Sequence, residues 1–225
     1  TILVSNFSWD FCFKEMLAVL SSRDVLTKEL TTQFESMIHQ CECDSASCRY
    51  YLQLPGCTPL PRNFPSEKRI PGPLIARQTR NIGLRSELSI PTGAKMLLLG
   101  FGGHSAEWDL KDSYLPEGWV CYVLGAKEVD MPSHRFRALS STAYVPDFIQ
   151  AADAVLGKLG YGFVSECITA NTALVYVPRV DWPEEQYLEL LVEDYGAGVR
   201  MSKEDFTTGN WAPCLHTATA LKNSW

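Results

Sequence analysis

The chain has 225 residues, of which 46% are hydrophobic and 20% are charged. This composition is typical of a globular protein and excludes wholesale disorder, while the length excludes a large multidomain enzyme. The net charge of −6 excludes the basic surface typical of proteins that bind nucleic acid or anionic membranes. We therefore expect small molecules or other proteins as partners.

No apolar run reaches the roughly 18 to 20 residues that a membrane-spanning helix needs, so we expect a soluble protein without a membrane span. The first residues, Thr1 to Ser5, contain no initiator Met and no secretory signal pattern. A fragment of a longer protein and a complete short chain both fit this beginning. We expect a cytoplasmic location, with the matrix of an organelle as the alternative.

Residues 1–54 predict a first strand, one or two amphipathic helices and a second strand. Apolar residues recur at helical spacing from Asp10 to Glu42, and a short strand follows at Tyr50 to Leu54. Six of the 13 prolines then fall within 19 residues, which excludes a helix or an inner strand. We assign residues 55–76 to a proline-rich linker and residues 77–225 to a second domain.

The cysteines favour no disulfide framework. Two of the eight, Cys121 and Cys167, lie in apolar runs, where a free Cys behaves as a small hydrophobic residue. Four others lie close together in the sequence: Cys41, Cys43, Cys48 and Cys57. Their number would suit a zinc ion, but their spacing lacks paired C-x2-C motifs, so we favour reduced thiols or one local disulfide over a metal.

The second domain shows short apolar strands that alternate with helices. The predicted strands are Lys95–Phe101, Trp119–Leu124, Thr142–Tyr144, Ala154–Leu156, Leu174–Val177 and Gly198–Met201. The predicted helices are Asp147–Asp153, Phe163–Ala170 and Glu184–Tyr195. This alternation predicts βαβ units, and therefore an α/β fold with a doubly wound parallel sheet.

Ligands of doubly wound sheets bind at the carboxyl ends of the strands, so the residues after each strand are the candidates. In Gly100–Ser105, glycines after a strand would let backbone N–H groups approach an anion, although a simple tight turn fits equally well. Val145-Pro146-Asp147 could pair with the edge of a base. The carboxylates and amide of Pro178–Gln186 could hold sugar hydroxyls or could simply begin a solvated helix.

The fourth candidate is the glycine-rich stretch Gly157–Glu166, which leads from a strand into a helix. A helix N-terminus with free N–H groups and the nearby Lys158 would suit a diphosphate. Glu166, which we expect in the first turn, could accept hydrogen bonds from ribose hydroxyls. The alternative is that Ser165 and Glu166 only cap the helix.

The order of three blocks carries a resemblance: GFGG, then YVPDFIQAADAVLGKLGYGFVSE, then LVYVPRVDWPEEQY. They resemble the nucleotide-sugar-binding C-terminal half of GT-B glycosyltransferases. The blocks VSNFSWDF, LPGC, YLPEGW and GKLGYG are similar to the glycosyltransferase-like N-terminal region of plant-type L-arabinokinases. The resemblance covers nearly all of the chain and implies a Rossmann-like C-terminal GT-B half, preceded in residues 1–54 by the end of the N-terminal half.

The resemblance also implies a ligand, a nucleoside-diphosphate sugar and in particular a UDP-sugar, with no metal or other cofactor. The implied diphosphate-binding residues are Gly102, Gly103, Lys158, Gly160, Gly162 and Ser165. Val145 would meet the base and Glu166 the ribose, while Glu185 and Gln186 would hold the donor sugar.

Two departures limit the expected chemistry. The acceptor loop of the N-terminal half and the sugar-kinase domain of arabinokinases have no counterpart in these 225 residues, so no catalytic base is assigned. The chain could act as the donor-binding part of an enzyme or as a binding module without turnover. It could also be an accessory subunit that keeps the fold. In that case Asp10–Glu42 and the stretch from Trp211 to Trp225 would contact protein partners, and we expect both tryptophans to be exposed. The same two segments could instead pack on a missing N-terminal half.

Overall fold

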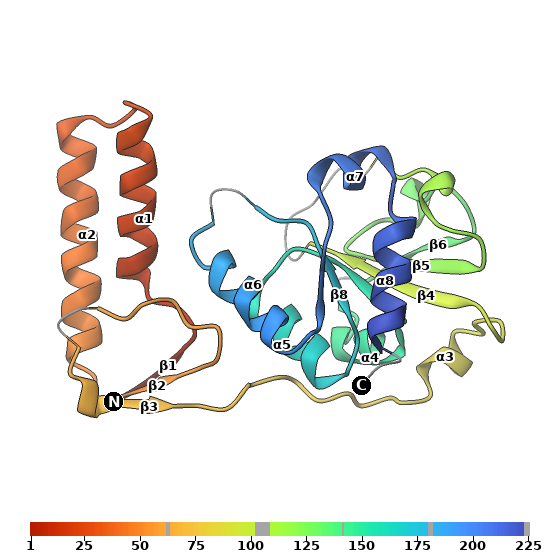
Figure 1. Ribbon diagram of the computed structural model, residues 1–225, viewed down its shortest axis with the longest axis horizontal. Helices are drawn as coiled ribbons and strands as arrows, with labels where there is room; N and C mark the ends of the chain where they lie inside the picture. Colours follow the sequence, from red (N-terminus) through yellow and green to blue (C-terminus); the bar gives the residue numbers. More distant parts are fainter. Residues whose placement is uncertain (62–63, 102–108, 141, 180–181, 223–225) are drawn as a thin grey trace. The chain divides into compact units, whose positions relative to one another are not determined.

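The computed structural model describes residues 1–61, 64–101, 109–140, 142–179 and 182–222. The chain divides into two compact units (Figure 1). The small unit comprises Thr1–Ile75 and Arg179–Leu191, and the large unit comprises Ala76–Pro178 and Val192–Trp225.

The small unit is built on a three-stranded parallel sheet in the order β1-β2-β3. Its strands are β1 (Ile2–Ser5), β2 (Tyr50–Gln53) and β3 (Arg69–Pro71), the last of which follows a 3-10 helix at Ser66–Lys68. β3 lies within the proline-rich stretch, where we expected no inner strand. It occupies an edge of the sheet, where a proline can be accommodated.

Two helices of the small unit, α1 (Trp9–Ser22) and α2 (Lys28–Ala46), pack against each other (Figure 1). The helical pattern from Asp10 to Glu42 therefore contains two helices, the second of the two arrangements that we expected. The turn between them contains Asp24 at φ 54°, and Thr27 caps α2 by accepting a hydrogen bond from Leu30 N–H (3.2 Å).

A buried polar contact ties residues 182–184 to the loop after β1. The Glu184 side chain accepts hydrogen bonds from Asn6 Nδ2 (2.6 Å) and Trp182 Nε1 (3.0 Å). Glu184 and Asn6 are both buried, so the contact satisfies groups that would otherwise be costly to remove from water. The helix α6 (Glu185–Asp194) follows directly.

The large unit contains six parallel strands in the order β6-β5-β4-β7-β8-β9. The strands are β4 (Lys95–Gly100), β5 (Trp119–Leu124), β6 (Phe136–Leu139), β7 (Ala154–Gly157), β8 (Leu174–Tyr176) and β9 (Gly198–Arg200). In order of appearance this is 3-2-1-4-5-6, the arrangement of a Rossmann fold. The predicted doubly wound α/β class is confirmed.

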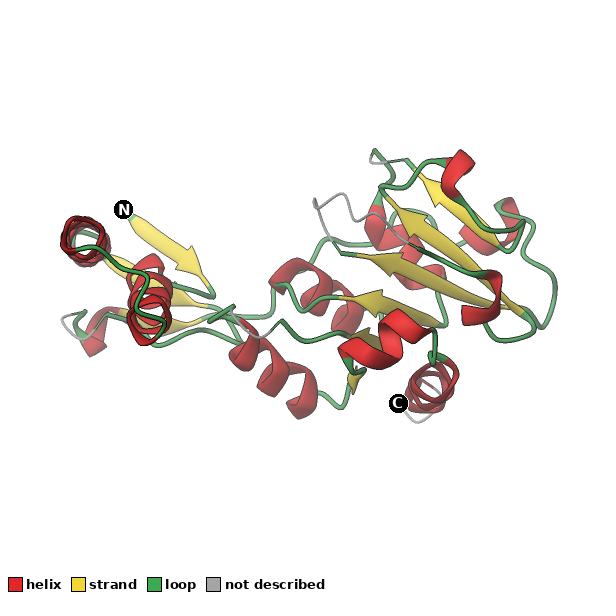
Figure 2. Cartoon of the chain, turned by 90° about the horizontal axis from the view of Figure 1, so that it is seen from above, coloured by secondary structure: helices red, strands yellow, loops and turns green. Residues whose placement is uncertain are grey.

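Helices cover both faces of this sheet (Figures 1 and 2). On one face lie α4 (Val145–Ala151) and α5 (Tyr161–Thr169), which contact each other, and on the other lies α8 (Ala212–Lys222), which contacts β7, β8 and β9. The remaining helices are short: α3 (Leu84–Glu87), α7 (Lys203–Thr208) and the 3-10 turns Asp112–Tyr114 and Glu128–Asp130. Within the described ranges, no helix is both long and apolar enough to cross a membrane.

The predicted strand Thr142–Tyr144 is wrong. Residues 142–144 form the turn that precedes α4, and the strand is β6, which ends at Leu139. β6 is an edge strand whose buried residues, Phe136 and Leu139, flank two partly exposed ones. It therefore lacks the continuous apolar run that marks the inner strands of a parallel sheet.

The cysteines are all free thiols. Cys121 and Cys167 are buried, as predicted, and burial raises the pKa of both thiols. Burial, together with the charges of Glu184 and Asp10, raises the pKa of the Cys12 thiol to about 11. Among the described residues, no three His, Cys, Asp or Glu side chains are grouped in a way that could hold a metal ion.

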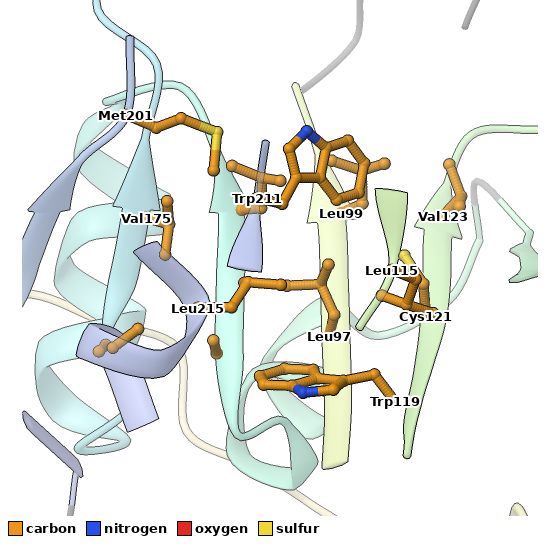
Figure 3. Packing of buried hydrophobic residues seen from close by; sticks show 14 of the residues in the cluster. Leu97, Leu99, Leu115, Trp119, Cys121, Val123, Val175, Met201, Trp211 and Leu215 are labelled. Carbon is orange, nitrogen blue, oxygen red and sulfur yellow. The ribbon is translucent and has the colours of Figure 1, made fainter. Parts of the chain in front are cut away.

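The apolar core of the large unit fills the space between the sheet and α8, and Trp211 is its largest fully buried residue (Figure 3). The Trp211 ring stacks on Phe206 with centroids 5.6 Å apart, and its Nε1 donates to Phe206 O (2.9 Å). The expectation that Trp211 is exposed for a partner is therefore wrong. Trp225 lies outside the described residues.

We predict that Trp211→Ala lowers the free energy of unfolding by about 3–5 kcal/mol, because it leaves a large cavity in this core. The matched control is Trp9→Ala, since Trp9 is 49% exposed and its loss should cost less, about 1–2 kcal/mol. Urea denaturation followed by circular dichroism measures both values. Equal losses in the two variants would contradict the packing described here.

Candidate functional site

The candidate site lies where the strand order of the large sheet reverses. β4 and β7 are neighbours, and the chain continues from β4 towards β5 and β6 on one side and from β7 towards β8 and β9 on the other. In open α/β sheets, ligands bind in the crevice beyond the carboxyl ends of the strands at such a point. The last residues of the two strands, Gly100 and Gly157, are paired in register.

Both strands end in glycine because the backbones and α5 approach each other closely there. A Cβ atom on Gly157 would lie 2.2 Å from Gly100 O and 3.2 Å from the ring of Phe163, which belongs to α5. A Cβ atom on Gly100 would lie 3.3 Å from the same ring. Any side chain at Gly157 would therefore push the two strand ends apart.

α5 begins at Tyr161 with Gly160 as its N-cap, two residues earlier than predicted. No side chain caps this end, and a Cβ atom on Gly160 or Gly162 would meet no other atom within 4 Å. The first N–H groups of a helix have no partner within the helix and carry its positive dipole end. This open turn, with the half-buried Lys158 just before it, has the chemistry of an anion site.

Ser165 and Glu166 lie in the second turn of α5, so they do not cap it and Glu166 is not in the first turn. Ser165 is fully buried, and its hydroxyl donates to Gly162 O (3.1 Å). Glu166 is only 4% exposed, and its carboxylate forms an ion pair with Arg77. The distances are 2.5 Å from Arg77 Nε to Oε1 and 3.3 Å from Nη2 to Oε2.

The Arg77–Glu166 pair borders a small pocket of about 50 Å³ between α4 and α5. The pocket is lined by Arg77, Gln78, Thr79, Pro146, Gln150, Glu166, Thr169 and Ala170. Pro146 follows Val145, which is the first residue of α4. The structure thus brings the segment predicted to meet the base next to the residue predicted to meet the ribose.

Asp147 in α4 fixes the segment that carries Arg77. Its Oδ1 accepts hydrogen bonds from Thr79 Oγ1 (2.8 Å), Arg80 N–H (2.6 Å) and Asn81 N–H (3.0 Å). Burial opposes the ionised form of Asp147, but these donors outweigh it and lower its pKa. The hydrogen bond to Glu166 is the main cause that raises the pKa of Arg77.

The other predicted site residues fall into two groups. Gly102 and Gly103 lie outside the described residues. Glu185 and Gln186 begin α6 and belong to the small unit. Glu185 is buried and accepts hydrogen bonds from Arg179 N–H and Nε (both 2.6 Å), and burial raises its pKa, whereas Gln186 is exposed.

Sequence reasoning missed Arg77 and Thr79. Arg77 is the first residue after the stretch that we assigned to a linker, and its partner Glu166 is 89 residues away in the sequence. The only local signal is a lone cation directly after the apolar run Leu74-Ile75-Ala76. Such a residue is equally consistent with a buried anionic partner and with a solvated surface position.

Comparison with solved structures defines the class of fold. The calicheamicin glycosyltransferase CalG4 aligns with a TM-score of 0.60 at 13% identity, covering 99% of this chain and 62% of that one. The Arabidopsis thaliana UGT89C1 in complex with UDP-L-rhamnose aligns with a TM-score of 0.54 at 14% identity, covering 99% and 61%. The chain therefore has the fold of GT-B glycosyltransferases, as predicted.

Comparison of sequences is more specific. L-arabinokinase of Arabidopsis thaliana is 35% identical over 225 residues, which is 99% of this chain and 20% of that protein. No protein-family model matches the chain. The predicted resemblance to the glycosyltransferase-like region of L-arabinokinase is confirmed, and the chain spans about a fifth of the length of this relative.

We predict that Gly157→Ala destabilises the large unit by at least about 1–3 kcal/mol, because the new methyl group would overlap Gly100 O. Gly162→Ala is the control: it adds the same methyl group to open space inside a helix and should leave stability unchanged or raise it by up to about 1 kcal/mol. Thermal unfolding of the two variants tests this. A Gly157→Ala variant as stable as the control would show that the strand ends are not in close contact.

Proposed function

We propose that the large unit binds a nucleoside-diphosphate sugar, in particular a UDP-sugar, as the donor-binding part of a glycosyltransferase-like protein. The observation that carries the proposal is the buried carboxylate of Glu166 in a pocket beside the start of α4. A carboxylate at this place offers strong acceptors to the two hydroxyls of a ribose. The open turn at Gly160 is on the same helix and supplies N–H donors for the diphosphate.

The solved relatives support the choice of ligand. UGT89C1 is solved in complex with UDP-L-rhamnose. UGT2 of Phytolacca americana is solved in complex with UDP-2fluoro-glucose and pterostilbene. It aligns with a TM-score of 0.54 at 12% identity, covering 97% of this chain and 64% of that one. The likeness in fold suggests uridine as the base. Val145 would then meet the base through its backbone, and Lys158 would add a positive charge near the diphosphate.

In a transfer reaction, these groups would stabilise the negative charge that develops on the departing nucleoside diphosphate. The helix dipole of α5 and the N–H groups of its first turn are oriented before the reaction, so they need no reorganisation in the transition state. Glu185 and Gln186, which belong to the small unit, stay a prediction for the donor sugar, and no residue is assigned to the catalytic base. The acceptor and the base would come from another part of a longer protein.

We predict that Glu166→Gln weakens UDP binding at least about tenfold, because hydrogen bonds to a charged acceptor contribute about 1.5–3 kcal/mol. The variant should remain folded, since the Arg77 side chain that loses its partner is 57% exposed. Glu117→Gln, an exposed position in the same unit, is the control and should bind like the unmodified protein. Isothermal titration calorimetry with UDP measures all three affinities.

The same titration separates the two alternatives for this protein. A donor-binding domain binds UDP saturably and loses this binding in Glu166→Gln. An accessory subunit that has kept only the fold gives no saturable heat with UDP in the unmodified protein. Equal affinities of Glu166→Gln and the unmodified protein would show that Glu166 does not hold the ribose.

A further inference from the structure

The ion pair between Arg77 and Glu166 bears on which nucleotides the pocket accepts. Building on the function proposed above, we propose that Arg77 is a positioning residue that makes the pocket selective for ribonucleotides over deoxyribonucleotides. It would do so by holding the Glu166 carboxylate in a fixed orientation towards the ribose hydroxyls.

The first argument is the burial of Glu166. An ionised carboxylate that is 4% exposed is costly unless a cation and hydrogen bonds compensate for the lost water. Among the described residues, the cation paired with Glu166 is Arg77. Without it, the buried carboxylate would lose the two donors that fix the positions of its oxygens.

The second argument is the number of acceptor positions. A carboxylate has about four lone-pair positions, two on each oxygen. Arg77 donates from Nε to Oε1 and from Nη2 to Oε2, and so leaves about one position free on each oxygen. Two adjacent hydroxyls of a ribose would match these two positions. The pocket of about 50 Å³ beside the pair exceeds the roughly 10–15 Å³ that one water needs.

The third argument is that Arg77 is itself held in place. Asp147 binds the backbone of the two residues Arg80 and Asn81 and the Thr79 hydroxyl. The Tyr144 hydroxyl donates to Gln78 O (2.9 Å), and the Arg77 guanidinium lies 5.6 Å from the centroid of the Tyr144 ring. These contacts tie the segment to the start of α4, so the orientation of Glu166 is set before a ligand arrives.

The experiment compares the affinities for UDP and 2′-deoxy-UDP in the unmodified protein, Arg77→Gln, Arg77→Lys and Arg80→Gln. Arg80 is the matched control, because its guanidinium lies in the same segment, 3.9 Å above the Tyr144 ring. The unmodified protein and Arg80→Gln should favour UDP by about tenfold or more. In Arg77→Gln the preference for UDP should fall below about threefold, while the affinity for 2′-deoxy-UDP stays unchanged. The preference in Arg77→Lys should lie between those of Arg77→Gln and the unmodified protein.

Two results would overturn the proposal while leaving the proposed function intact. One is an unchanged ratio in Arg77→Gln, which includes an equal loss of affinity for both nucleotides. The other is tighter UDP binding, which would mean that Arg77 blocks the pocket. A failure of the unmodified protein to bind UDP would overturn the proposed function and this proposal together. Unchanged affinity for 2′-deoxy-UDP also shows that the variant is folded.

Discussion

The candidate site depends on the ion pair between the buried Glu166 carboxylate and Arg77, because a buried charge is costly unless a cation and hydrogen bonds compensate for the lost water. Glu166 is on α5, while its partner Arg77 comes from the segment that precedes β4. Asp147 of α4 binds three donors of that segment. The ion pair and the Asp147 contacts together connect two helices and an extended segment around one pocket.

The glycines at the ends of β4 and β7 impose a second constraint on the same region. Gly157 has no Cβ atom, so the Phe163 ring packs directly on the strand ends and α5 starts close to the sheet edge. Its N-terminus is left without a side-chain cap. The two constraints place an uncapped helix N-terminus and a buried carboxylate on one helix, and the proposed nucleotide site rests on this combination.

The parts of the fold that the sequence predicts well are those with a single strong local cause. β5 is predicted residue for residue, and β4, β7 and β8 to within one residue at an end, because inner strands of a parallel sheet are continuous apolar runs. The edge strand β9 is also predicted to within one residue. β6 and β3 are missed because edge strands need fewer apolar residues and tolerate proline.

Tertiary contacts account for the remaining errors. Trp211 near the C-terminus has no periodic neighbours that would indicate burial, and only the packing of α8 on the sheet reveals it. The glycine-rich turn and Glu166 are predictable because helix starts and acidic residues after strands have local signatures. The Arg77–Glu166 pair joins residues 89 positions apart, and no local pattern encodes such a pairing.

The most direct test of this account is to map the binding of UDP onto the backbone by nuclear magnetic resonance. In a titration of the isotope-labelled protein, we expect the amide signals of Gly160 to Val164, Gln78 and Thr79 to shift together and to saturate with one dissociation constant. The absence of saturable shifts, or shifts confined to residues of the small unit, would contradict the assignment of this pocket as a nucleotide site.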